Sequence, residues 1–346
     1  MLLLTFLQLA IHSMASGATI AVSSFAQVPT TAAGPPVQTP PAYRVQPFGD
    51  GAYLVTDGIY QGLFFVACES VIMVDAPPSI GENMVRAVRN ITTKPISHVV
   101  YSHHHADHIG GAYLYGPPMN ITFIAHRITA EQLALSPDYD HRPAPTVTFE
   151  SSMSLEVGNQ TLRLDYHGPN HEPGNIFIYA PSQKILMLVD VVYPGWIPFN
   201  ALGEVQSVPG YIRAHDQLLT YDFEHFVGGH LNRAGTRQDV IISQEYVHDL
   251  YETAVSAIGM SAEANSSLSV ASVIEPSVEK LDLNNPWALF DTYIDILADY
   301  VTKNLADRWS DRLYGTDVYG RSHAMAMLES VRIDFGILGP FGVTNA

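Results

Sequence analysis

The sequence has one cysteine, few charged residues and no excess of positive charge. A single cysteine, Cys68, excludes an internal disulfide and a cysteine-rich zinc site. Acidic residues outnumber basic ones 34 to 17, so the formal net charge is −17. Such a chain repels a phosphate backbone, and we expect no nucleic-acid partner. Charged residues make up 15% and hydrophobic residues 47%, which excludes a disordered or collagen-like chain.

The amino-terminal residues 1–22 contain no Lys or Arg and are mostly apolar, although polar residues interrupt them. Such interruptions do not suit a membrane span but are tolerated in a signal peptide, and small residues precede a cleavage point after Ala26. We expect residues 1–26 to be a signal peptide, the protein to be secreted or extracytoplasmic, and the mature chain not to bind a membrane. A membrane anchor and a misassigned start codon are the alternatives. Residues 27–42 are expected to be a linker without fixed structure.

Short apolar runs separated by turn residues predict strands, and runs with helical spacing alternate with them. The expected strands are 52–56, 63–67, 71–75, 96–101, 122–125, 153–157, 160–165, 176–179, 184–190 and 226–227. The expected helices include 80–90, 208–219, 287–304 and 324–333. No repeat with the roughly 20–50-residue period of solenoids is present, so sheets covered by helices are favoured. We expect one folded domain at 43–260 and a helical extension at 261–346.

A cluster of histidines follows the predicted strand 96–101, and residues 103–108 have the pattern H-x-H-x-D-H. His103 and His105 lie two residues apart, so an extended backbone points both imidazoles to the same side. Asp107 and His108 follow as the chain turns into a helix, where they can face a second centre close by. Imidazoles with carboxylates suit Zn²⁺, and also Fe or Mn, so we expect a metal site here. A polar, histidine-rich loop is the alternative.

Four further motifs accompany this cluster. Asp75 and Asp190 each end a predicted strand, His171 lies in a loop rich in Gly and Pro, and His230 follows a short strand. All five motifs occur in the order typical of the metallo-β-lactamase-fold hydrolase superfamily, which the chain resembles over residues 43–250. The resemblance implies an α/β fold, the αβ/βα four-layer sandwich, with metals at one rim and the helical extension added after it.

The resemblance also assigns roles to these residues. The first metal is expected to be held by His103, His105 and His171, and the second by Asp107, His108 and His230, with Asp190 bridging both. Asp107 is also expected to act in catalysis. Asp75 is expected to orient the site without binding a metal, and a buried structural carboxylate is the alternative. Two Zn²⁺ per chain are expected, with Fe or Mn possible.

By this resemblance we expect a secreted di-zinc hydrolase that acts on a small molecule. A metal-bridging hydroxide would attack the carbonyl bond of a lactam, lactone or ester. Aspartate at position 190, where some lactamases have a cysteine ligand, is more similar to glyoxalase II-like enzymes. The alternatives are a glyoxalase II-like thioesterase, a mono-iron persulfide dioxygenase and a non-catalytic relic of the fold.

The loop after Asp190 is expected to bind the substrate through its aromatic residues, Tyr193, Trp196 and Phe199, or else these only anchor the loop. Residues 191–200 contain no Lys or Arg, and Arg233 and Arg237 are the basic residues nearest to the last motif. A lactamase or a glutathione thioesterase needs a cation for its anionic substrate, so we expect a neutral, partly apolar substrate. The extension is expected to serve as scaffold; capping the site and dimerisation are alternatives.

Overall fold

The computed structural model describes residues 25–274 and 284–342. The predicted signal peptide, residues 1–26, therefore lies outside the described residues except for Phe25 and Ala26. In the described part of the chain, no helix combines the length and the apolar character needed to cross a membrane.

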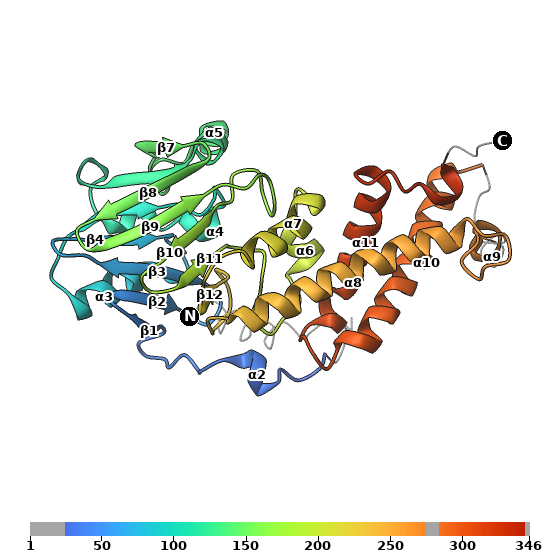
Figure 1. The fold of residues 1–346 in the computed structure, drawn as a ribbon, viewed down its shortest axis with the longest axis horizontal. Helices are drawn as coiled ribbons and strands as arrows, with labels where there is room; N and C mark the ends of the chain where they lie inside the picture. The colour runs from blue at the N-terminus through green and yellow to red at the C-terminus, as the bar shows by residue number, and fades with distance from the viewer. Residues whose placement is uncertain (1–24, 275–283, 343–346) are drawn as a thin grey trace, which may run out of the picture.

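Two β-sheets lie face to face in the part of the fold on the left of Figure 1. The first sheet follows chain order: β1 (Arg44–Gly49), β2 (Ala52–Thr56), β3 (Gln61–Val66), β4 (Val71–Val74), β5 (Ile96–Val100), β6 (Thr122–His126) and β7 (Val147–Phe149). The second has the order β12 (His225–Val227), β11 (Ile185–Met187), β10 (Phe177–Ala180), β9 (Gln160–Asp165) and β8 (Ser152–Val157). Every strand expected from the sequence is present. The pattern did not predict β1, which contains Pro47, or β7, which is three residues long; both are edge strands, where pairing is weakest.

Helices cover the outer faces of the sheets and form the region on the right of Figure 1. They are α2 (Thr30–Ala33), α3 (Glu82–Ile91), α4 (Ala106–Ile109), α5 (Arg127–Leu135), α6 (Asn200–Glu204), α7 (Val208–Leu218), α8 (Arg237–Ser261), α9 (Val270–Ile274), α10 (Pro286–Trp309) and α11 (Thr316–Ile333). Short 3₁₀ turns lie at Ala112–Tyr115, Pro118–Asn120 and Gly339–Phe341.

The alternation of side chains along the strands divides the core into layers. Leu63 and Phe65 of β3 face the second sheet, where they pack in one buried cluster with Leu164 of β9 and Ile178 of β10. Phe64 points to the opposite face and packs in the cluster that includes residues of α3. This order of helix, sheet, sheet and helix confirms the four-layer αβ/βα sandwich.

The helical extension shares its core with the second sheet. The outward-facing Phe177 and Leu186 belong to the same buried cluster as Tyr246 of α8, Leu297 of α10 and Met327 of α11. The long helix α8 runs from the sheets to the extension and packs on both α10 and α11 (Figure 1). Because the apolar contacts are continuous, the extension is joined to the sandwich by packing as well as by the chain.

Residues 27–42 differ from the unstructured linker expected from their composition. They contain α2, whose Ala32 is only 3% exposed, and they run along the body of the protein (Figure 1). The Trp196 Nε1–H donates to the Ala32 carbonyl at 3.1 Å, and Asn232 donates to the carbonyls of Ala33 and Pro35. Composition did not reveal this packing because the partners lie far away in the sequence.

Candidate metal centre

The predicted ligands lie together because the loops that carry them leave the sheets at the same rim. The histidine cluster follows β5, and Asp190 and His230 follow β11 and β12. His171 precedes β10, whose start lies beside the end of the antiparallel strand β11. The close approach of these loops requires a glycine at position 229. Gly229 has a φ of +84°, and a Cβ there would lie 2.6 Å from Val189 Cγ1 and 3.2 Å from His108 Cε1.

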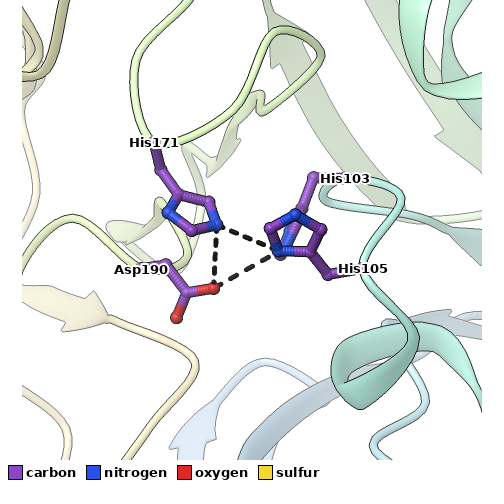
Figure 2. Close-up of side chains that lie close together, drawn as sticks. All are labelled: His103, His105, His171 and Asp190. Atoms are coloured by element: carbon purple, nitrogen blue, oxygen red, sulfur yellow. Dashed lines mark hydrogen bonds and ion pairs between the residues drawn. The ribbon is translucent and has the colours of Figure 1, made fainter. Parts of the chain in front are cut away.

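A first cluster is formed by His103, His105, His171 and Asp190, whose candidate ligand atoms all lie within 4.8 Å of one another (Figure 2). Asp190 Oδ2 lies 3.6 Å from His103 Nε2 and 3.4 Å from His171 Nε2. His171 Nε2 lies 3.1 Å from His105 Nδ1. His103 Nε2 is buried and has no hydrogen-bond partner, which is the state expected of an imidazole whose free nitrogen is directed at a metal. The donor set therefore fits a metal ion.

A second cluster is formed by Asp107, His108 and His230. Asp190 joins it to the first, because its Oδ1 lies 2.8 Å from His230 Nε2 while its Oδ2 lies 3.1 Å from His108 Nε2. Oδ2, which also lies near His103 and His171, thus faces both clusters, whereas Oδ1 faces the second cluster. This is the arrangement that the sequence predicts for a bridging aspartate, and all seven predicted ligand positions are brought together.

Burial and charge prepare the protonation states that metal binding needs. Burial and the neighbouring imidazoles hold the pKa of His103 well below its usual value, and lower the pKa of His105 to about 4. Burial alone would raise the pKa of Asp190, but attraction to His108, His230 and His171 holds it well below its usual value. His103 and His105 are therefore neutral and Asp190 ionised at neutral pH, and these are the forms that coordinate metals.

His108 behaves differently from the other histidines. Burial would lower its pKa, but in the metal-free protein the attraction of Asp190, Asp107 and Asp75 raises it to about 9. A cation bound at the second cluster would have to displace this proton, so its affinity should rise with pH.

Asp75 lies outside both clusters and is hydrogen-bonded to the histidine loop. Its Oδ1 accepts a hydrogen bond from the Ser102 N–H at 2.8 Å, and the Ser102 hydroxyl lies 2.9 Å from His103 Nδ1. Asp75 is therefore connected to His103 of the first cluster through hydrogen bonds of Ser102. Asp75 is fully buried, and burial raises its pKa to about 6.

His104 turns away from the clusters. Its Nδ1 lies 3.2 Å from Oε2 of Glu172, a completely buried carboxylate that also accepts a hydrogen bond from the Gly174 N–H at 2.9 Å. No motif pointed to Glu172, although its place directly after the predicted ligand His171 was a signal for it.

Tyr60 is a second residue that the sequence analysis missed. It lies at the tip of the β2–β3 hairpin, and its hydroxyl donates to Asp107 Oδ2 at 3.1 Å. Its ring packs on His230 and His108, at centroid distances of 4.6 and 5.4 Å. Tyr60 therefore contacts all three residues of the second cluster. No motif in the sequence marked it.

A cavity of about 700 Å³ opens above the two clusters. The predicted aromatic residues Tyr193, Trp196 and Phe199 all line it. Further lining residues come from outside the sandwich: Phe25, Tyr314, Gly315, Val318 and Tyr319. The extension therefore does more than serve as scaffold, since part of it forms a wall of the cavity.

No Lys or Arg lines this cavity within the described part of the chain. Arg233 forms an ion pair with Asp239 at 2.6 Å, and Arg237 donates to the carbonyls of Tyr221 and Leu219. Both basic residues that follow the last motif are thus held by other partners.

Comparison with known proteins identifies the family. A family model described as the metallo-beta-lactamase superfamily matches residues 58–233, slightly more than half of the chain. The solved structure of a metallo-beta-lactamase from Pontibacter korlensis is similar in fold, with a TM-score of 0.52 and 19% identity, over 60% of this chain and 99% of that chain.

Three curated relatives match shorter stretches. The 2,4-dinitroanisole O-demethylase subunit alpha of Nocardioides sp. (strain JS1661) is 26% identical over 201 residues, which is 57% of this chain and 60% of that protein. The linear primary-alkylsulfatase of Pseudomonas sp. (strain ATCC 19151) is 24% identical over 38% of this chain and 33% of that protein. The metallo-beta-lactamase type 2 of Bacillus cereus is 27% identical over 36% of this chain and 48% of that protein.

The chain therefore spans less than two thirds of the length of each of these relatives. The matched family region contains all seven predicted ligand positions, and the structure places their side chains in two adjoining clusters. The chain belongs to the metallo-beta-lactamase superfamily.

Proposed function

We propose that this protein is a metal-dependent hydrolase with two Zn²⁺ per chain that cleaves a carbonyl bond in an uncharged small molecule. The observation that carries the proposal is the position of the Asp190 carboxylate, which lies near ligands of both clusters. It lies beneath a cavity without Lys or Arg among its described lining residues. When bound, two such ions polarise a carbonyl oxygen and make water nucleophilic near neutral pH.

The chain's own groups hold and orient the reactants in this proposal. The Asp107 side chain is 47% exposed and lines the cavity, so its carboxylate can orient the attacking water and accept its proton. The Tyr193 hydroxyl lies 3.2 Å from Asp190 Oδ1. Burial and the charge of Asp190 hold the pKa of Tyr193 well above its usual value, so its hydroxyl stays protonated and donates to Asp190 Oδ1, which helps to orient the bridging carboxylate.

The residues that line the cavity favour an uncharged substrate. Tyr60, Tyr193 and Trp196 line the cavity, and so does the acidic Glu204. An anionic group of the substrate that lies away from the metal ions would meet the carboxylate of Glu204 with no Lys or Arg beside it among the described lining residues. The proposal therefore favours an uncharged lactone, lactam or ester over a penicillin or a glutathione thioester, and over nucleic acid.

Rates on matched substrates test this proposal. We expect kcat/KM for a neutral lactone to exceed the values for a benzylpenicillin-type lactam and a glutathione thioester at the same ionic strength. Metal analysis and oxygen uptake on the same sample address the alternative, because a persulfide dioxygenase holds one iron and consumes oxygen. A clear preference for either anionic substrate would contradict the proposal.

An uncharged aryl ether is a second candidate substrate. The relative that is similar over 57% of this chain is named for O-demethylation of 2,4-dinitroanisole, an uncharged aryl methyl ether. Seven of the twenty described lining residues are Phe, Tyr or Trp, and such side chains suit a planar ring. Release of 2,4-dinitrophenol from 2,4-dinitroanisole by the metal-loaded protein would favour this reaction, and its absence would leave the carbonyl substrates.

A further inference from the structure

We propose that the helical extension determines substrate selectivity. Val318 and Tyr319 of α11 form one wall of the cavity, called here the outer wall, and α11 also holds α6, which forms the adjoining wall. The part of the substrate remote from the cleaved bond would be an uncharged, apolar group that rests against Val318 and Tyr319. This inference rests on the proposed function and adds the location of the contacts that select the substrate.

The outer wall comes from a part of the chain that the family match does not reach. The match ends at residue 233, whereas Tyr314, Val318 and Tyr319 line the cavity. Val318 is 38% exposed although it is apolar, and it faces the hollow above the metal clusters. A family member without this extension would lack these contacts.

The extension is attached directly to the aromatic loop after Asp190. The Ile197 N–H donates to the Tyr314 carbonyl at 2.9 Å, and the Tyr314 N–H donates to the Gly195 carbonyl at 3.0 Å. The rings of Trp196 and Tyr314 lie edge to face with their centroids 4.1 Å apart. These contacts fix the distance between the loop and the outer wall.

The turn α6 is strained, and it forms the adjoining wall through Gly203 and Glu204. Ala201, Leu202 and Glu204 have φ values of 48°, 62° and 58°, in the left-handed region that non-glycine residues rarely adopt. Such residues persist only where the surroundings hold them, and they concentrate at functional sites. A Cβ at Gly203 would lie 3.1 Å from the backbone carbonyl oxygen of Asp190 and 3.0 Å from the Tyr193 hydroxyl, so this turn packs closely against the backbone of the bridging residue.

The helix α11 supplies the contacts that hold this turn. The Ala201 N–H donates to the Ser322 hydroxyl at 2.9 Å, and the buried His323 Nε2–H donates to the Phe199 carbonyl at 2.9 Å. The Tyr246 hydroxyl lies 2.8 Å from His323 Nδ1 and fixes the orientation of the imidazole. The rings of Phe199 and Tyr319 pack with their centroids 4.9 Å apart. A substitution in α11 would therefore alter the cavity wall directly, and also by changing how α6 is held.

The test measures ligand binding and turnover with the full-length, metal-loaded protein. The ligand is N-phenyl-1-naphthylamine, an uncharged fluorescent probe, and the substrates are p-nitrophenyl acetate and p-nitrophenyl octanoate. We expect Val318→Asp and Tyr319→Ala each to weaken probe binding by about ten-fold or more, through a charge against an apolar ligand and through loss of a ring. kcat/KM for the octanoate should fall by a similar factor, while the acetate changes less than about two-fold and metal content stays the same.

Two control variants locate the effect. Arg321 lies on the same helix but pairs with Asp295 and Asp299. Arg321→Gln should therefore change neither probe binding nor kcat/KM for the esters. Trp287→Ser alters a second hollow of about 610 Å³ at the end of the extension, and probe binding should persist. If folded, metal-loaded Val318→Asp and Tyr319→Ala bind the probe and discriminate the esters as the wild type does, the inference is wrong.

Equal losses on both esters together with loss of metal would also overturn it, because α11 would then be a scaffold for the metal centre. Failure of the proposed function has a different signature. In that case the wild type hydrolyses no neutral carbonyl substrate, while probe binding still reports whether α11 forms the wall.

Discussion

The Tyr60 hydroxyl lies 3.1 Å from Asp107 Oδ2, so a hairpin 47 positions earlier in the chain reaches the exposed carboxylate of the second cluster. The hairpin tip is held by the loop of the last motif: the Gln61 N–H donates to the Gly229 carbonyl, and the Leu231 N–H donates to the Ile59 carbonyl. Tyr60 is thus positioned by backbone bonds on both sides. Its hydroxyl orients a predicted ligand from outside the metal site.

We predict that Tyr60→Phe weakens the second metal more than the first. Loss of a partner that orients a ligand costs roughly ten-fold or more in metal affinity, and the phenyl ring keeps the packing on His230. Stepwise metal titration against a competing chelator measures both sites in one sample. Tyr113→Phe, at a surface tyrosine, is the matched control. Unchanged affinity at the second site would show that the hydrogen bond does not matter.

We predict about two zinc-like ions per chain, and loss of both from Asp190→Ala, because this carboxylate serves both clusters and separates two cations. Elemental analysis of protein purified without chelators gives the ratio. Asp222→Asn, on the surface, should keep the wild-type content. One tightly bound iron with no second metal would contradict the dinuclear site.

His104→Ala should keep much of the activity, whereas His105→Ala should abolish it. His105 Nδ1 lies in the first cluster, but His104 Nδ1 contacts Glu172. Turnover and metal content of the two variants make the comparison between neighbouring histidines. If His104→Ala is as inactive as His105→Ala while still folded, the assignment of ligands within the motif is wrong.

Asp75→Asn should remove a pH-dependent loss of stability. Burial raises the pKa of Asp75 to about 6 in the folded state, above the ordinary carboxyl value of the unfolded chain. The folded state then binds the proton more tightly, so the free energy of unfolding falls as pH rises from about 4 to about 6 and levels off above it.

Urea unfolding of the metal-free protein at several pH values measures this slope. The difference between wild type and Asp75→Asn isolates it from other titrating groups, and Asp222→Asn should follow the wild type. Parallel stability curves for wild type and Asp75→Asn would exclude a raised pKa at this position.

Processing of the amino terminus should leave a mature chain that begins near Gln27 and is found outside the cytoplasm. Cleavage there removes Phe25 from the cavity lining, and it removes the bond from the Ala26 N–H to Asp317 Oδ2 at 2.8 Å. N-terminal sequencing of native material decides the point. An intact Met1 on a soluble intracellular protein would contradict export.

The sequence by itself determined ten of the strands and the order of the motifs, and the family resemblance that rests on those motifs supplied the predicted ligands. His103 and His105 lie on one side of an extended segment, and Asp190 ends an apolar run. Both patterns are local, so they can be recognised without knowledge of the fold. Strand periodicity likewise identified ten of the strands, and it failed only at β1 and β7 on the sheet edge.

Only the tertiary structure decided what surrounds these ligands. The contact of Tyr60 with Asp107 and the place of Val318 on the outer wall join segments that are far apart in the sequence, and no motif indicates them. The pairing of Arg233 with Asp239 likewise decided that this cation is held outside the cavity. Such contacts depend on how helices and loops pack on the sheets, because a side chain's charge or ring says nothing about which distant partner it meets.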